Sequence, residues 1–180
     1  MSARVVSVAR SPVHGFSKFP EDRIDLVEGM GVLGDAHAGA LVRHRSRVRV
    51  DPAQPNLRQV HLLAAELLDE VAAHGHPVAP GALGENITTR GIDLIALPRG
   101  TDLHIGRFAV LTVTGLRNPC SQIDDFSPGL LAHVLRRGKD GGLERRAGIM
   151  AVVTVGGPVS CGDDIQIVMP ARPHQALERV

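Results

Sequence analysis

The sequence of 180 residues lacks tryptophan and tyrosine and contains only four phenylalanines and two cysteines. The shortage of aromatic rings weighs against binding of single-stranded nucleic acid, which uses such rings as stacking platforms. Two cysteines cannot build a disulfide framework. No apolar run is long enough to span a membrane, and no signal-peptide core follows Met1. We therefore expect a cytoplasmic protein that binds neither nucleic acid nor membranes.

The sequence also lacks a large excess of either sign of charge, because the formal net charge is only +1. A nearly neutral protein has no global field that would attract polyanions. Positive charge is nevertheless concentrated in one stretch, which contains Arg43, His44, Arg45, Arg47, Arg49 and Arg58. This stretch is either a solvated basic loop or a binding site for an anion such as phosphate, which arginine contacts with two hydrogen bonds.

The apolar content of 43% is ordinary for a globular protein, and the length predicts a single domain over residues 1–180. Strand-like runs occur at residues 4–9, 58–62, 85–89, 101–105, 108–114, 149–155 and 164–168. Apolar spacing predicts helices over residues 64–74 and from Ser127 to Gly138. We expect loops over residues 10–30 and 139–146 and a frayed tail from Pro170. This order predicts a mainly β fold, a closed or nearly closed barrel with a few peripheral helices.

Cys120 is the leading candidate for chemistry. The strand-like run at residues 108–114 ends in a turn, and Cys120 follows three residues after Arg117. A cysteine reacts or binds metal as the thiolate, which nearby cations favour. The alternative is a buried, inert thiol, the commoner role of a free cysteine, and we assign that structural role to Cys161. Arg117 either assists Cys120 or forms a surface ion pair with Asp124 or Asp125.

Two glycine-punctuated segments carry further polar candidates. Asp35 and His37 lie in the loop at residues 31–39, and Glu85 and Asn86 follow Gly84. These side chains can hydrogen-bond a polar heterocycle, or they can serve only as turn and cap residues. A zinc site would need further ligands such as His14, His44 or His61, and the spacing matches no recognised zinc pattern.

Several motifs occur in one order along the chain: Gly31-Val32-Leu33-Gly34-Asp35-Ala36-His37-Ala38-Gly39, Arg58-Gln59-Val60, Pro80-Gly81-Ala82-Leu83-Gly84-Glu85-Asn86-Ile87-Thr88-Thr89, Gly115-Leu116-Arg117-Asn118-Pro119-Cys120, Ala147-Gly148-Ile149-Met150-Ala151-Val152-Val153, and Gly156-Gly157-Pro158-Val159 with Gly162-Asp163. In this order they resemble the MOSC domain family, the molybdenum cofactor sulfurase C-terminal domain, over residues 25–170. Many bacterial members of the family carry a His-Gly-Gly-type segment after the Gly-Asp loop. This chain has His44-Arg45-Ser46-Arg47-Val48-Arg49 there instead.

The resemblance implies a β-barrel with a pocket for the molybdenum cofactor, a molybdopterin, in which Cys120 ligates the metal. It also implies reduction of a small N-hydroxylated substrate with electrons from an external donor. The residues expected to bind the cofactor are Asp35, His37, Arg45, Arg47, Arg58, Glu85, Asn86, Arg117 and Asn118.

Two alternatives remain open. The chain can be a sulfur-carrier or sulfur-transfer protein that bears a persulfide on Cys120 and works with a desulfurase dependent on pyridoxal phosphate. It can also be a non-catalytic barrel that binds a small anion or a partner through its arginine-rich loop.

Overall fold

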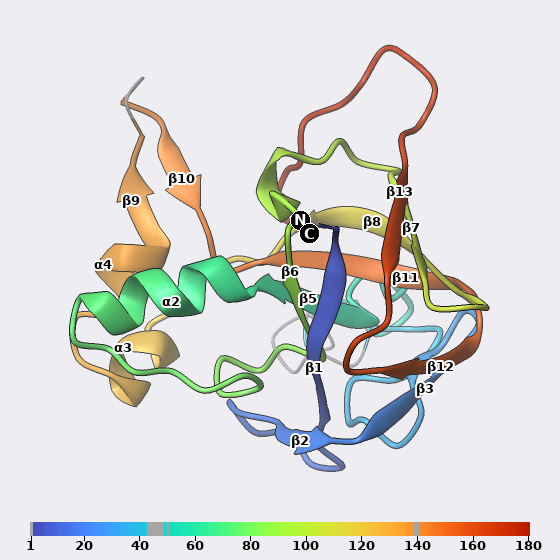
Figure 1. Ribbon diagram of the computed structural model, residues 1–180, viewed down its shortest axis with the longest axis horizontal. Coiled ribbons are helices and arrows are strands. Elements are labelled where there is room, and N and C mark those ends of the chain that lie inside the picture. The colour runs from blue at the N-terminus through green and yellow to red at the C-terminus, as the bar shows by residue number, and fades with distance from the viewer. Residues whose placement is uncertain (1, 43–48, 50, 139–140) are drawn as a thin grey trace.

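A computed structural model describes residues 2–42, 49, 51–138 and 141–180 of the protein. The largest sheet has eight strands in the order β13-β7-β8-β11-β5-β6-β1-β2 (Figure 1). Its strands are β1 (Arg4–Arg10), β2 (Phe19–Glu21), β5 (Val60–Ala64), β6 (Ile87–Arg90), β7 (Asp102–Ile105), β8 (Ala109–Leu116), β11 (Ile149–Val155) and β13 (Ile165–Val168). A smaller sheet contains β12 (Gly157–Ser160), β3 (Arg23–Val27) and β4 (Gly31–Val32).

The mainly β fold is confirmed, whereas the closed barrel is not. Among the described residues the large sheet keeps two edges, β13 and β2. β2 pairs only with residues 8–10 of β1. The first residues of β1 therefore have a backbone edge that β2 does not cover. There the Val5 N–H donates to the Asp163 carbonyl at 2.8 Å, and Arg4 bridges to Asp164. This isolated bridge brings β1 beside the turn before β13 without a continuous ladder between the two strands.

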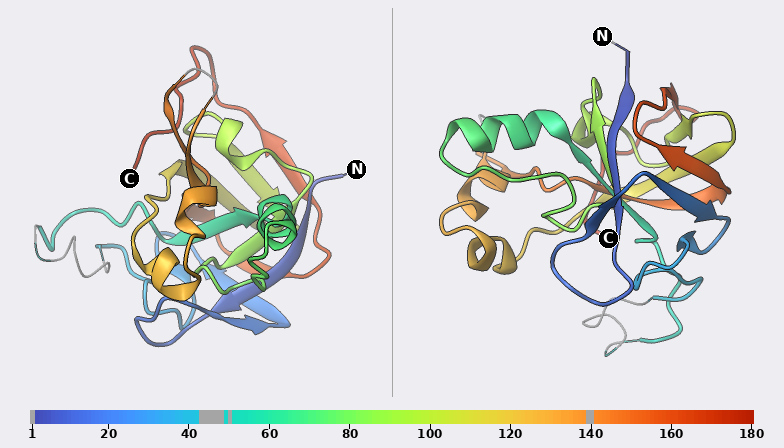
Figure 2. Two further views of the ribbon diagram at one scale, coloured as in Figure 1. Left: turned by 90° about the vertical axis from the view of Figure 1, so that its left-hand side faces the viewer. Right: turned by 60° about the horizontal axis from the view of Figure 1, so that its bottom comes forward.

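The helices lie on one side of the sheets, together with the hairpin of β9 (Leu135–Arg137) and β10 (Leu143–Arg145) (Figures 1 and 2). The predicted helix over residues 64–74 is confirmed as α2 (Ala65–Ala73). Its buried Leu67, Leu68 and Val71 pack in a core cluster with Ile123 and Val134. A larger apolar cluster fills the space between the strands. A short 3-10 helix, η1 (Leu94–Ala96), follows β6.

The prediction of a second long helix from Ser127 to Gly138 was wrong. The short helix α3 (Gln122–Phe126) ends before this interval, only the one-turn helix α4 (Leu131–Val134) lies within it, and the chain after α4 enters β9. Gly129 adopts a φ of +90° between them, a left-handed conformation that interrupts a helix. The loop expected at residues 139–146 contributes β10, which pairs with β9.

Other predicted boundaries also shifted. The loop expected over residues 10–30 contains β2 and β3, and the tail expected to fray returns to the end of β8. Short strands of this kind gain their stability from pairing rather than from their own sequence. Most of the arginine-rich stretch, including Arg45 and Arg47, lies outside the described residues. No helix in the described part of the chain is long and apolar enough to cross a membrane.

Candidate functional site

A pocket of about 740 Å³ lies where loops from distant parts of the chain meet. Its walls include Gly15, Phe16 and Lys18, which precede β2, and five residues that follow β8, namely Arg117, Asn118, Cys120, Ser121 and Gln122. His37, Asn86 and Met150 complete further parts of the wall. The volume falls within the range of about 300–1,000 Å³ that is typical of small-molecule and cofactor sites.

The lining of the pocket is basic. Its nitrogen-bearing basic side chains are Lys18, His37, Arg58, His61, Arg117 and Arg179. None of the described lining residues is an aspartate or a glutamate. Two acidic residues, Asp35 and Glu85, are buried in the protein but do not line the pocket. A concave surface of one charge sign concentrates oppositely charged solutes, so this pocket favours an anionic ligand.

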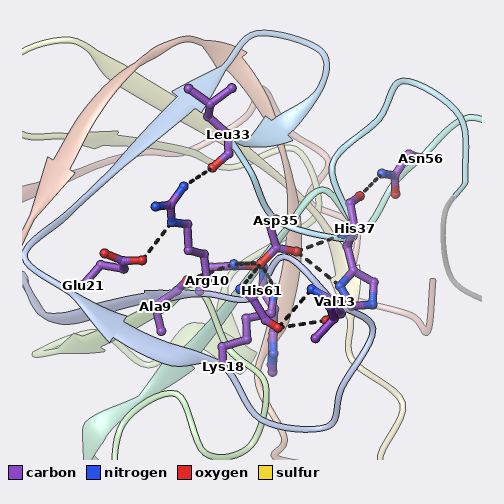
Figure 3. A network of polar contacts seen from close by, with 12 residues as sticks. Ala9, Arg10, Val13, Lys18, Glu21, Leu33, Asp35, His37, Asn56 and His61 are labelled. Carbon is purple, nitrogen blue, oxygen red and sulfur yellow. Dashed lines mark hydrogen bonds and ion pairs between the residues drawn. The ribbon is translucent and has the colours of Figure 1, made fainter.

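Asp35 is the centre of a buried hydrogen-bond network (Figure 3). Lys18 Nζ donates to its Oδ2 atom at 2.6 Å, and Asn86 Nδ2 donates to the same oxygen at 3.1 Å. The backbone N–H of Ser11 also donates to Oδ2 at 3.2 Å. Its Oδ1 atom accepts from the His37 backbone N–H at 2.9 Å and lies 3.2 Å from His37 Nδ1. Both carboxylate oxygens are therefore satisfied.

This network determines the charges of Lys18 and Asp35. Their side chains are only 5% and 1% exposed, respectively. Burial by itself would raise the pKa of Asp35, but the hydrogen bonds with His37 and the charge of Lys18 hold that pKa well below its usual range. Burial lowers the pKa of Lys18, and the charge of Asp35 opposes this shift. The pair is consequently a buried ion pair whose partners depend on each other.

Asn86 links this network to His61 at the start of β5. The His61 backbone N–H donates to Asn86 Oδ1 at 3.2 Å, and Asn86 Nδ2 also donates to the Ala9 carbonyl at 3.1 Å. The His61 ring contacts the Ala147 carbonyl through Nε2 at 2.8 Å; because a carbonyl only accepts, Nε2 carries the proton. Burial and the charge of Arg117 hold the pKa of His61 well below its usual value, so this ring is neutral.

Glu85 and Arg117 lie within electrostatic reach of each other but form no ion pair among the described residues. Glu85 Oε1 accepts from the Gly81 N–H at 2.7 Å and from Thr88 Oγ1 at 3.2 Å. In contrast, Glu85 Oε2 and Arg117 Nη1 are both buried and have no hydrogen-bond partner among the described residues. Burial raises the pKa of Glu85 and lowers that of Arg117. Each such orphaned atom costs about 1–3 kcal/mol.

Cys120 is partly buried in the pocket wall just beyond Arg117. Its Sγ atom lies 3.5 Å from Gln122 Oε1. Burial lowers the pKa of Arg117, and an electrostatic interaction with Cys120 opposes this shift, so the two side chains lie within electrostatic reach of each other. Among the described residues Arg117 forms no ion pair with Asp124 or Asp125. Asp124 Oδ1 instead accepts from the Leu131 N–H at 2.8 Å. Cys161 is exposed, lies outside this pocket and donates to the Val6 carbonyl at 2.9 Å.

Comparison with known proteins identifies the family. The family model of the MOSC domain matches residues 37–166, which include most of this pocket. The chain belongs to the MOSC domain family. No curated protein sequence matches it significantly.

Solved structures show the same fold. The YuaD protein from Bacillus subtilis is 26% identical, with a TM-score of 0.76 over 95% of this chain and 98% of that chain. YiiM from Geobacillus stearothermophilus is 17% identical, with a TM-score of 0.64 over 97% and 79% of the two chains. YiiM from Escherichia coli is 18% identical, with a TM-score of 0.59 over 96% and 73%.

The structure of this MOSC domain brings together most of the residues predicted from the sequence. The predicted residues that line the pocket are His37, Arg58, Asn86, Arg117, Asn118 and Cys120. Asp35 and Glu85 do not line it; each hydrogen-bonds groups of the protein itself. Arg45 and Arg47 lie outside the described residues.

Sequence reasoning missed several residues of the MOSC pocket, above all Lys18 and Arg179. Lys18 lies in the stretch that is predicted to be a loop, and Arg179 lies in the tail that is predicted to fray. No local motif marks either residue, because both reach the pocket through contacts between distant segments. For His61 the sequence suggests no role beyond that of a possible zinc ligand. In the described part of the chain, no three His, Cys, Asp or Glu side chains converge to hold a metal ion.

Proposed function

We propose that the pocket binds the molybdenum cofactor, with Cys120 as the metal ligand, and that the protein reduces N-hydroxylated small molecules. The observation that carries this proposal is the shared pocket of Cys120 and Arg117. The thiol supplies a soft ligand, and the buried Nη1 atom of Arg117 offers a hydrogen bond that no described residue accepts. An orphaned donor of this kind calls for a further partner, such as a ligand.

The residues present fit such a group. Arg58 and Arg117 would hold the phosphate of the molybdopterin through charged hydrogen bonds. Cys120 would be the single protein ligand, since no further metal-binding side chains gather around it in the described residues. When bound, the cofactor supplies a centre that transfers two electrons.

The reaction requires protons as well as electrons. Two electrons and two protons convert an N-hydroxyl group into an N–H group and water. The electrons would come from an external donor. Lys18 and His37 line the pocket and bear exchangeable protons, and Asp35 holds both in position. These two side chains are therefore the candidates to deliver protons to the departing oxygen.

Metal analysis tests this proposal. The protein is produced in a host that makes molybdenum cofactor, and its molybdenum and pterin contents are measured by mass spectrometry and fluorescence. We expect Cys120→Ser to lower the molybdenum content by more than about tenfold, because even residues that only support a metal ligand are worth that much in affinity. Cys161→Ser is the matched control and should retain the metal. Wild-type protein without molybdenum and pterin would refute the proposal.

A second candidate function, sulfur transfer, uses the same thiol. The charge of Arg117 beside Cys120 would stabilise a persulfide anion as it would a thiolate. The persulfide would come from a cysteine desulfurase dependent on pyridoxal phosphate. Incubation with such an enzyme and cysteine should add one sulfur atom to wild type and to Cys161→Ser but not to Cys120→Ser, as read by intact-protein mass spectrometry. An unmodified wild-type protein would exclude this function.

A further inference from the structure

The segment at residues 177–180 lies beside the end of β8, directly before the loop that carries Cys120. The Leu116 N–H donates to the Glu178 carbonyl at 2.7 Å, and the Val180 N–H donates to the Leu116 carbonyl at 3.4 Å. Leu116 and Arg179 form a parallel bridge. Leu177 packs against the main core. Figure 1 shows the chain arching away after β13 before it returns to this position. The segment is therefore held against β8, and its last two residues, Arg179 and Val180, line the pocket.

Gly115 makes this close approach possible. A Cβ atom at residue 115 would lie 2.5 Å from the Glu178 carbonyl oxygen and 2.5 Å from a methyl carbon of Val180. The first of these atoms belongs to the backbone, so any larger residue would push the segment away from β8. Gly115 does not have a positive φ, so its role is to leave room rather than to adopt a special backbone conformation.

This placement brings Arg179 to the pocket. Lys18 is paired with Asp35 at 2.6 Å, and Glu85 lies within electrostatic reach of Arg117. Arg179 is exposed, lines the pocket and has no ion-pair partner among the described residues. Its charge is thus available to a molecule that enters from solvent.

We infer that residues 177–180 form a substrate-binding wall and that Arg179 selects small molecules that carry a carboxylate for reaction at Cys120. A guanidinium pairs with a carboxylate through two parallel hydrogen bonds, and its charge also raises the local concentration of anions. The inference rests on the proposed function only in that it takes this pocket as the active site. The alternative source of negative charge is the phosphate of the cofactor, and the experiment separates the two.

The first test compares two alkylating reagents of similar size, anionic iodoacetate and neutral iodoacetamide. Rates of modification at Cys120 are measured by mass spectrometry in the Cys161→Ser background, on full-length protein from a host that makes no cofactor. The ratio of the two rates reports the local charge and cancels changes in thiol reactivity. We expect Arg179→Gln to lower the iodoacetate-to-iodoacetamide ratio by about threefold, because a single exposed charge attracts an anion only weakly and is screened by salt.

Matched variants test the location. Arg172→Gln removes an exposed arginine that does not line the pocket and should leave the ratio unchanged. Gly115→Ala should lower the ratio as Arg179→Gln does, because it displaces the whole segment. An unchanged ratio in Arg179→Gln would overturn the inference, whatever the result for Gly115→Ala.

The second test separates substrate from cofactor. Arg179→Gln protein from a host that makes the cofactor should contain as much molybdenum as wild type. A fall in its molybdenum content would assign Arg179 to the cofactor phosphate and overturn the substrate role. Because the alkylation rates need neither cofactor nor turnover, loss of the proposed molybdenum function would leave the first test intact.

Discussion

Two carboxylates, Asp35 and Glu85, are buried near the pocket without lining it. They differ in how many of their oxygen atoms have hydrogen-bond partners. Asp35 uses both oxygens, holds Lys18 and His37, and has a pKa well below its usual range. Glu85 leaves Oε2 without a partner among the described residues, and burial raises its pKa. The Asp35 side is a closed network that builds the pocket wall. The Glu85 side leaves hydrogen-bonding capacity in Arg117, and this unused capacity marks where a ligand would bind.

The largest expected effect is the loss of stability on breaking the closed network. Asp35→Asn leaves the charge of Lys18 buried without a counter-ion, so we expect the free energy of unfolding to fall by about 3–5 kcal/mol. Urea unfolding measures this change. The control Asp25→Asn removes a partner of the surface ion pair with Arg23 and should cost less than about 1 kcal/mol. Equal losses in the two variants would contradict the importance of burial.

The same network predicts a pH dependence. The pKa of Asp35 in the folded protein lies below its unfolded value of 3.8, so the ionised carboxylate stabilises the fold above that pH. This contribution is lost as the pH falls below about 4 towards the folded pKa. The difference in unfolding free energy between wild type and Asp35→Asn should therefore shrink between pH 5 and about pH 3. A difference that stays constant over this range would show that Asp35 is not ionised and paired.

The smallest effect is expected at the other carboxylate. Glu85→Gln keeps an oxygen that can accept from Gly81 and Thr88, and it replaces a group whose pKa burial already raises. We expect the free energy of unfolding to change by less than about 1 kcal/mol. A loss as large as that of Asp35→Asn would show that Glu85 is a charged partner of Arg117, and the comparison between the two carboxylates would fail.

The regular parts of the fold were predictable from the sequence. Strands at residues 4–9 and 149–155 appear as β1 and β11, and the hairpin around Gly106 appears as β7 and β8. These segments have enough apolar, β-branched residues to indicate strands locally. Short strands such as β2 and β9 carry no such signal, because their pairing partners stabilise them.

The candidate site was predictable to the extent that local motifs carry it. The turn before Cys120 and the glycine-rich loop around Asp35 place polar groups at chain reversals, where functional residues often lie. The role of each group was not predictable. Asn86 has a side chain that could hydrogen-bond a ligand, yet its amide is engaged within the protein: it donates to Ala9 and Asp35 and accepts from His61.

The sequence by itself determined the family and the mainly β composition of the fold, and it marked Cys120 as the leading candidate for chemistry. Those features follow from local patterns and from the order of motifs along the chain. Only the tertiary structure decided which charges are compensated and which are available. Lys18 pairs with Asp35 across 17 residues, and Arg179 reaches the pocket because β8 has a glycine where the returning segment packs. Electrostatic energies depend on distance and burial, and neither quantity is encoded in a local motif.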